Sequence, residues 1–183
     1  MPGRHWRRAR RLGRSFAAAA SICAAATMLA APAWAEPPAE SSDQPTPCWA
    51  EQIAVSASPT QGAVGHRALT LIFSLAGGAE PCTLTGYPGV DSGAGGPAIH
   101  AVPTLRGYLG GLPASVDVPP SVTLSIPTQA QAIVEGIAVD GSGNPCPSYT
   151  DLRVNPPDTT MVFTVPASID ACELQVHPLT PGQ

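Results

Sequence analysis

The sequence predicts an all-β fold, namely an immunoglobulin-like antiparallel β-sandwich with two disulfides. Apolar residues alternate with period two in several short runs, as they do in strands with one buried face. The 183-residue chain contains 22 prolines and 18 glycines, which favour short elements and many turns over long helices. Four cysteines follow an N-terminal export signal, and an even number is typical of disulfide-stapled exported domains. The immunoglobulin-like topology is an analogy with other sandwiches of short strands.

Residues 1–35 have the three parts of a secretory signal peptide. Six arginines form a basic start, an alanine-dominated apolar stretch spans residues 16–31, and Ala33-Trp34-Ala35 supplies small residues before a cleavage site. A transmembrane anchor would need about 20 strongly apolar residues, whereas this stretch is shorter and poor in Leu and Ile. We therefore expect cleavage before Glu36 and no stable membrane insertion afterwards.

The rest of the chain divides into a spacer and one domain. Residues 36–47 are rich in Pro, Glu and Ser, with no apolar periodicity, and are predicted to be a disordered spacer. Residues 48–183 are long enough to form a single β-sandwich domain with its own core.

Signal cleavage changes the charge of the chain. Six of the nine basic residues lie in the signal, all 13 acidic residues remain, and there is no lysine. Three arginines, Arg67, Arg106 and Arg153, then face 13 acidic residues, so the net charge is −10 with histidine neutral. Such a chain is repelled by phosphate backbones and anionic lipid surfaces. Nucleic acid is therefore excluded from the expected partners.

Cys48, Cys82, Cys146 and Cys172 are expected to form two disulfides. Four cysteines allow three connectivities, and the sequential one, Cys48–Cys82 with Cys146–Cys172, is favoured because each pair brackets a compact block of predicted strands. In the loop-entropy model each bridge contributes about 3.5 to 4 kcal/mol. No cysteine spacing matches C-x-x-C and no paired histidines follow, which disfavours a metal or redox site.

Five runs read as strands. The clearest is Leu69–Leu75, in which Leu69, Leu71, Phe73 and Leu75 alternate with smaller or more polar residues. Similar patterns occur at Ile53–Ser56, Val122–Ile126 and Met161–Val165. The apolar run Ala130–Val139 is compatible with a strand or a short helix, and its β-rich neighbours favour a strand.

Turn signals separate these runs. Tyr87-Pro88-Gly89 predicts a type II turn, in which Pro fixes φ and Gly supplies a positive φ. Gly93–Pro97 and Asp140–Pro145 have the composition of hairpin loops. The segment Asn155-Pro156-Pro157-Asp158 blocks both a helix and a central strand.

Two groups of side chains suggest chemistry. Asp91-Ser92-Gly93 resembles the loop of aspartic proteases, but that chemistry needs two carboxylates, and no second such string exists. We favour an ordinary turn there. His66, His100 and His177 are far apart in the sequence and share no ligand motif, so we favour surface or hydrogen-bonded structural histidines.

Residues 107–113, Gly-Tyr-Leu-Gly-Gly-Leu-Pro, form an apolar and flexible segment. It is a candidate contact loop for a partner. The alternative, which we favour slightly, is that it folds over the open end of the sandwich.

The most specific string in the chain is PCTLTGYPGV at residues 81–90. With Gly65-His66 before it, and Pro156-Pro157 and a final cysteine after it, it resembles a family of exported actinobacterial, often mycobacterial-type, proteins. That family is a domain of unknown function, number 4232, and its members share a C-T-L-x-G-Y-P-G-V block.

The resemblance covers residues 48–178. It is loosest before the third cysteine, around Pro119-Pro120-Ser121 and Gln129-Ala130, which affects the bounds of that strand. It implies a β-sandwich in the cell envelope or outside the cell. It brings no catalytic residues, because none is established for the family.

The sequence therefore predicts a secreted, non-catalytic β-sandwich module that binds a protein or a cell-envelope component. No catalytic, cofactor-binding or metal-binding residue is assigned. The alternative is a secreted hydrolase that uses Asp91 or a histidine. It would require Asp91 to face a second carboxylate, or two histidines to come within metal-bridging distance.

Overall fold

A computed structural model describes residues 45–182, so the predicted signal peptide and residues 36–44 of the predicted spacer lie outside the described residues. No helix within residues 45–182 is long and apolar enough to span a membrane. The elements are one 3₁₀ turn and twelve strands. Their bounds are η1 (Ala50–Gln52), β1 (Ile53–Ala57), β2 (Gln61–Ala63), β3 (His66–Leu75), β4 (Cys82–Thr85), β5 (Gly89–Ser92), β6 (Val102–Pro103), β7 (Ser121–Leu124), β8 (Ala130–Ile137), β9 (Ser148–Asn155), β10 (Phe163–Asp170), β11 (Glu173–Val176) and β12 (Thr180–Pro181).

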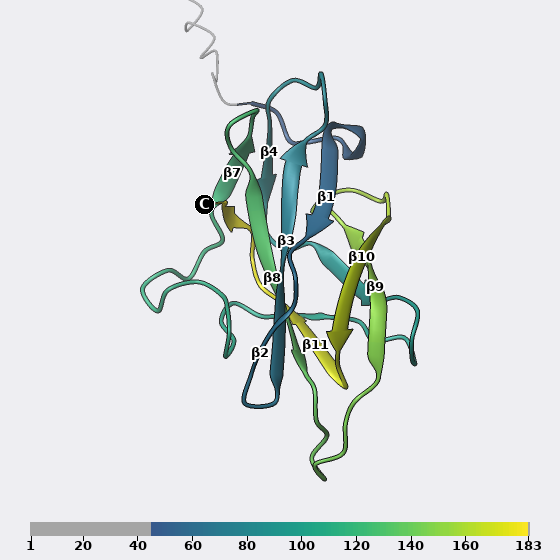
Figure 1. The fold of residues 1–183 in the computed structure, drawn as a ribbon. Helices are drawn as coiled ribbons and strands as arrows, with labels where there is room; N and C mark the ends of the chain where they lie inside the picture. Colours follow the sequence, from purple (N-terminus) through teal and green to yellow (C-terminus); the bar gives the residue numbers. More distant parts are fainter. Residues whose placement is uncertain (1–44, 183) are drawn as a thin grey trace, which may run out of the picture. The chain divides into compact units, whose positions relative to one another are not determined.

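The strands form two layers around one core (Figure 1). The larger sheet has the order β1-β3-β8-β11-β6, with β2 on β3 and β12 on β8. The smaller sheet has the order β10-β9-β5, and β4 and β7 form a separate two-stranded ladder. All strand pairs are antiparallel except β11 with β6. The predicted all-β sandwich is confirmed, and the arrangement is consistent with an immunoglobulin-like fold.

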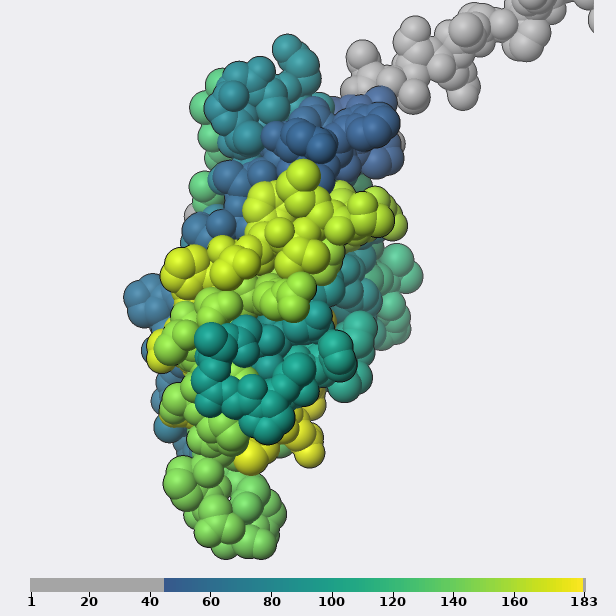
Figure 2. All heavy atoms as spheres, turned by 90° about the vertical axis from the view of Figure 1, so that its right-hand side faces the viewer, coloured from purple at the N-terminus to yellow at the C-terminus, as the bar shows by residue number. Residues whose placement is uncertain are grey.

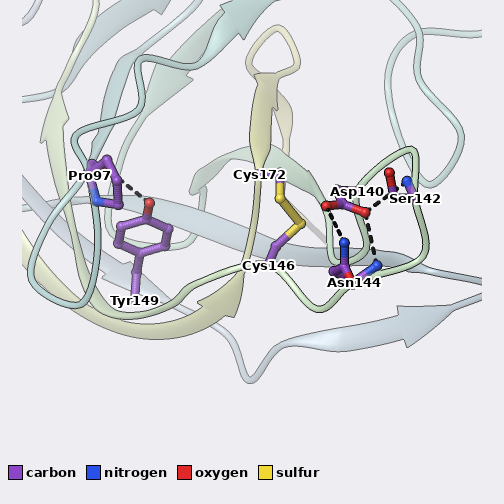
Figure 3. The surroundings of a disulfide bond; sticks show 7 residues. All are labelled: Pro97, Asp140, Ser142, Asn144, Cys146, Tyr149 and Cys172. Atoms are coloured by element: carbon purple, nitrogen blue, oxygen red, sulfur yellow. Dashed lines mark hydrogen bonds between the residues drawn. A yellow bond between two sulfur atoms is a disulfide. The ribbon is translucent and has the colours of Figure 1, made fainter.

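Side-chain alternation in the central strands places the core. Leu69, Leu71 and Phe73 of β3 are buried, as their period-two spacing predicts. The ambiguous run after residue 129 is the strand β8, in which Ala130, Ala132 and Val134 face the same core. Across the core, Tyr149 of β9 is fully buried, and its hydroxyl donates a hydrogen bond to the Pro97 carbonyl at 2.7 Å (Figure 3). This bond satisfies the polar end of a large core side chain.

Both disulfides of the sequential pairing are present. Cys48–Cys82 ties the start of the domain to β4, and Cys146–Cys172 ties the segment before β9 to the turn between β10 and β11 (Figure 3). Next to the first bridge, the Thr83 amide donates to the Thr46 carbonyl at 2.9 Å, and Pro47 pairs with Thr83. Backbone pairing thus begins two residues inside the predicted spacer.

Three local predictions differ from the structure. The type II turn at Tyr87-Pro88-Gly89 is wrong, because Gly89 already pairs with Asn155 of β9 and the positive φ of 96° belongs to Gly86. The strand predicted to reach Ile126 ends at Leu124, because Ser125 and Thr128 exchange backbone hydrogen bonds in a turn that leaves Ile126 exposed.

The strand predicted from Met161 begins instead at Phe163. The side-chain amide of Asn155 donates to the Met161 carbonyl at 2.9 Å. That contact holds the residues before β10 in the connection from β9, and the Met161 side chain is 41% exposed.

The strand β10 is an edge of the smaller sheet. It contains Pro166, and its register against β9 shifts between Pro166 and Ile169. Figure 2 shows the side of the domain where β9 and β10 lie, with the loop around residues 140–145 projecting at its lower end.

Candidate functional site

A cluster of ionisable side chains lies on the outer face of the larger sheet. Successive residues of a strand point to opposite faces. Because Leu69 and Val134 point into the core, His66 at the start of β3 and Glu135 of β8 point outward. His177, which follows β11, joins them there, and its backbone amide donates to the Ile133 carbonyl of β8 at 2.9 Å.

Glu135 is the centre of this cluster. His66 Nδ1 lies 2.9 Å from Glu135 Oε1, and His177 Nε2 lies 3.3 Å from Glu135 Oε2. Glu135 is 4% exposed and His177 is 1% exposed. An outward-facing glutamate is buried here only because another segment of the chain covers it.

The covering segment is the Tyr108 loop, residues 104–112, which follows β6. The Tyr108 amide donates to Glu135 Oε1 at 3.2 Å, and the Leu109 amide donates to Glu135 Oε2 at 3.0 Å. The carboxylate therefore accepts two backbone N–H groups, as an anion does in a backbone nest.

Two glycines allow this close approach of the Tyr108 loop to the sheet. A Cβ at Gly107 would overlap the Glu135 carboxylate and lie 2.6 Å from His177 Cε1. A Cβ at Gly110 would lie 2.8 Å from His177 Cδ2. Any larger residue at either position would push the loop away from the carboxylate that anchors it.

The Tyr108 side chain lies over the cluster and faces solvent. Its ring stacks on the His66 imidazole with centroids 4.5 Å apart, and Tyr108 remains 62% exposed. Beside it, a cavity of about 190 Å³ lies between the loop and the sheet, and Leu109, Ile133 and Thr70 contribute to its lining.

Arg106 stabilises the chain that follows. Its guanidinium donates to the carbonyls of Pro113, Ala114 and Val116, and it pairs with Asp117 at 2.8 Å. Within the loop, the Gly107 amide donates to the Gly110 carbonyl and the Leu112 amide to the Leu105 carbonyl. The loop is therefore held in one conformation by its own contacts and by Glu135.

The polar atoms of this cluster are already engaged with one another. Glu135 and His177 are buried, and the two carboxyl oxygens of Glu135 have four hydrogen-bond partners. Within residues 45–182, no three His, Cys, Asp or Glu side chains are arranged to hold a metal ion. What reaches solvent is the Tyr108 ring and part of His66.

The sequence matches one family model over residues 48–180, which is most of the chain. The chain belongs to the family described as domain of unknown function DUF4232. No curated protein and no solved structure matches it.

In this DUF4232 domain, the sequence-predicted candidate Asp91 lies in β5 and not in a turn. It lies opposite Arg153 of β9 in the strand register, because β5 extends through Ser92 and the chain reverses only after Gly93. Its carboxylate lies 2.6 Å from Nδ1 of His100, which is 82% exposed. Within residues 45–182, no second carboxylate pairs with Asp91, and no hydroxyl or thiol is hydrogen-bonded to His100.

The three histidines thus have different surroundings. His66 and His177 converge on Glu135, whereas His100 pairs with Asp91 on another part of the DUF4232 domain. Sequence reasoning did not single out Glu135. The signal that marks it is the only ionisable residue of a largely apolar strand, at a position that alternates outward.

A larger cavity lies elsewhere in the domain. It is an open groove of about 970 Å³ between the β1–β2 connection and β10. Small residues line most of it, and its charged groups, Arg67 and Asp170, already pair with each other at 3.4 Å. The groove therefore offers less directed chemistry than the Tyr108 loop.

Proposed function

We propose that this DUF4232 domain is a secreted, non-catalytic module that binds a protein partner, and that the Tyr108 loop is its binding surface. A cell-envelope component that is not a protein is the alternative partner. The observation that carries this proposal is the exposed Tyr108 ring, whose backbone is fixed by hydrogen bonds to the buried Glu135 carboxylate.

The physical reasoning concerns preorganisation. An exposed aromatic side chain contributes most to binding when its backbone is already fixed, because little conformational entropy is then lost on association. Tyrosine is among the residues that dominate interfaces. Two amide hydrogen bonds to Glu135 and the stack on His66 fix Tyr108 before any partner arrives.

Secretion is part of the proposal. Residues 1–35 have the pattern of a cleaved signal, and two disulfides favour an oxidising compartment. The resemblance of residues 81–90 to an exported actinobacterial, mycobacterial-type family supports an extracellular or envelope location. The net charge of the mature chain argues against a nucleic acid partner.

Site-directed photocrosslinking tests the binding surface. A photoreactive phenylalanine analogue at position 108 should capture a protein from the envelope fraction of the source organism. The same analogue at position 153, an exposed site in β9 of the other layer, should not. Capture from position 153 alone, or from neither position, would overturn the proposal.

A quantitative binding assay with the purified captured protein then separates contact from chance proximity. We expect Tyr108→Ala to weaken binding at least about tenfold, as removal of an interface anchor does. Tyr108→Phe should retain binding within about threefold, because the ring supplies the contact area. Equal affinity of wild type and Tyr108→Ala would contradict the assignment.

The secreted hydrolase remains the second candidate function, supported by the Asp91–His100 contact. A carboxylate that orients a histidine is a recurrent part of hydrolase sites. Hydrolysis of generic ester or peptide substrates that Asp91→Asn and His100→Ala both abolish would favour it. Activity unaffected by either substitution would exclude these residues.

A further inference from the structure

The hydrogen bonds of His177 fix where its protons lie. Nδ1 is 2.8 Å from the Thr104 carbonyl oxygen. A carbonyl only accepts, so Nδ1 carries a proton. Nε2 faces Glu135 Oε2 at 3.3 Å. A neutral imidazole already protonated on Nδ1 would direct its Nε2 lone pair at an ionised carboxylate oxygen. Two acceptors would then face each other without a hydrogen bond, which is unfavourable in a buried site.

One proton must therefore lie between Nε2 of His177 and Oε2 of Glu135. It makes either an imidazolium that faces a carboxylate or an imidazole that faces a carboxylic acid. In both cases the pair shares one hydrogen bond, and neither atom is left as a buried, unpaired acceptor.

The surroundings of this pair are few. On β3, Nδ1 of His66 lies against Oε1 of Glu135. The Tyr108 loop supplies two backbone amides to the carboxyl group, and the Tyr108 ring stacks on His66. On β11, the cross-strand neighbour of Glu135 is the uncharged Gln175. Within residues 45–182, no arginine forms an ion pair with Glu135. Apart from the two loop amides, the groups that face the carboxylate are thus the two histidines.

We propose that this shared proton is a pH-sensitive latch for the Tyr108 loop. When the proton is lost to bulk water at alkaline pH, a lone pair faces a buried anion, and the carboxylate must regain water. The Tyr108 loop covers the pair directly, with Gly107 against the carboxylate and the His177 ring and Gly110 against the His177 ring. Lifting of this loop is therefore the route by which water returns.

The start of the Tyr108 loop is tied to the sheet, because Thr104 bonds Val176 and His177, whereas the residues that follow it are held together by bonds of their own. The internal bonds of the loop, from Gly107 to Gly110 and from Leu112 to Leu105, do not involve Glu135. The Arg106 contacts also lie within residues 106–117. The loop-closed state binds a proton that the open state releases, so closure weakens as pH rises. That closure regulates partner binding rests on the proposed function; the latch itself does not.

Amide hydrogen exchange on the full, disulfide-bonded chain tests the latch. Protection of the Tyr108 and Leu109 amides, corrected for the intrinsic rate at each pH, should fall at least about tenfold as the pH is raised from acidic to alkaline. The Ser142 and Asn144 amides are the matched control, because they donate to Asp140, a carboxylate that shares no proton. Parallel behaviour of both pairs of amides would overturn the latch.

A second measurement on the wild type avoids reliance on a variant that could fail to fold. The ¹⁵N chemical shift of His177 Nε2 should report loss of its proton over the pH range in which the Tyr108 and Leu109 amides lose protection. Titration of His177 without a change in these amides would contradict the latch. So would loop opening without titration of His177.

Two variants complete the test. Glu135→Gln cannot carry the charge and should remove the pH dependence of the Tyr108 and Leu109 amides, whereas Asp140→Asn should leave it intact. Binding of the captured partner is measured in parallel. A pH-dependent loop without any partner binding defeats the proposed function alone, and binding with pH-independent loop exchange defeats the latch alone.

Discussion

Two glycine-rich loops of this domain each wind around a carboxylate, and they differ in where the hydrogen-bond donors come from. In the Asp140 loop, residues 140–145, Asp140 accepts from the Ser142 amide and from the amide and side chain of Asn144, at 2.8 to 3.0 Å (Figure 3). All donors lie within five residues. In the Tyr108 loop, the donors to Glu135 come from β3, from the segment after β11 and from the loop itself.

The Asp140 loop is stabilised by hydrogen bonds within its own sequence, whereas the Glu135 contacts join segments that are far apart in the sequence. Asp140 is partly exposed in a solvent-exposed loop, and its hydrogen bonds, first that of the Asn144 side chain, lower the pKa of its carboxyl. This Asx-type turn forms from its own sequence. Glu135 is buried and has its partners only when three distant segments have come together. Perturbation of the global fold should therefore affect the Glu135 contacts far more than the Asp140 contacts.

The largest expected effect comes from the disulfide beside the Asp140 loop. Cys146→Ala combined with Cys172→Ala should lower the free energy of unfolding by about 3.5 kcal/mol, because the bridge closes a long loop of the unfolded chain. Urea denaturation under oxidising conditions measures it. The Asp140 hydrogen bonds should persist in the folded fraction. A loss below about 1 kcal/mol would show that the bridge is not a main source of stability.

Next in size is the loss of charge at Glu135. Glu135→Gln should destabilise the domain by about 3 kcal/mol, since it leaves buried donors without an acceptor. Asp140→Asn is the matched control and should shift the denaturation midpoint far less, because its hydrogen bonds lie within a solvent-exposed loop. Similar midpoint shifts for the two variants would remove the distinction between the loops.

A pair of glycine substitutions probes the same contrast through packing. Gly107→Ala should cost about 2 kcal/mol, because its Cβ would overlap the Glu135 carboxylate and the His177 ring. Gly141→Ala in the Asp140 loop has nothing within 4 Å of its Cβ and no positive φ. It should be neutral or slightly stabilising in the same thermal or urea unfolding assay. A destabilising Gly141→Ala would mean that the Asp140 loop is more constrained than its exposure indicates.

The smallest effect is the acid titration of Asp140. Its pKa is lowered by folding, so its contribution to stability is present above the unfolded pKa and is lost as pH falls through the lower folded pKa. A ¹³C NMR titration of the carboxyl should give a midpoint below the usual 3.8. Asn144→Ala should raise that midpoint. An unchanged midpoint in Asn144→Ala would show that the Asn144 side chain is not the main cause.

The features that could be predicted from the sequence are those that depend on a local residue pattern. The alternation of Leu69, Leu71 and Phe73 predicted the central strand β3, and the glycines and asparagine after Asp140 predicted a loop. The turn at Pro88-Gly89 was wrong because pairing of Gly89 with β9 overrides a local preference.

The Glu135 cluster was beyond such reasoning. His66 and His177 share no motif, since their meeting point is a residue of a third strand and depends on the register of β3, β8 and β11. Residues 107–113 were expected, slightly in preference to a contact loop, to fold over the open end of the sandwich. The structure places the segment instead over Glu135 on the outer face of the larger sheet, and it leaves the Tyr108 ring exposed.

The outer strand of the smaller sheet has a consequence for self-association. Pro166 has no N–H to offer, and the register shift after it interrupts the repeat of donors and acceptors along β10. A second copy of the chain therefore meets a broken template at this edge and cannot extend the sheet in register past it. On this side, the domain is thereby protected against growth into a continuous intermolecular sheet.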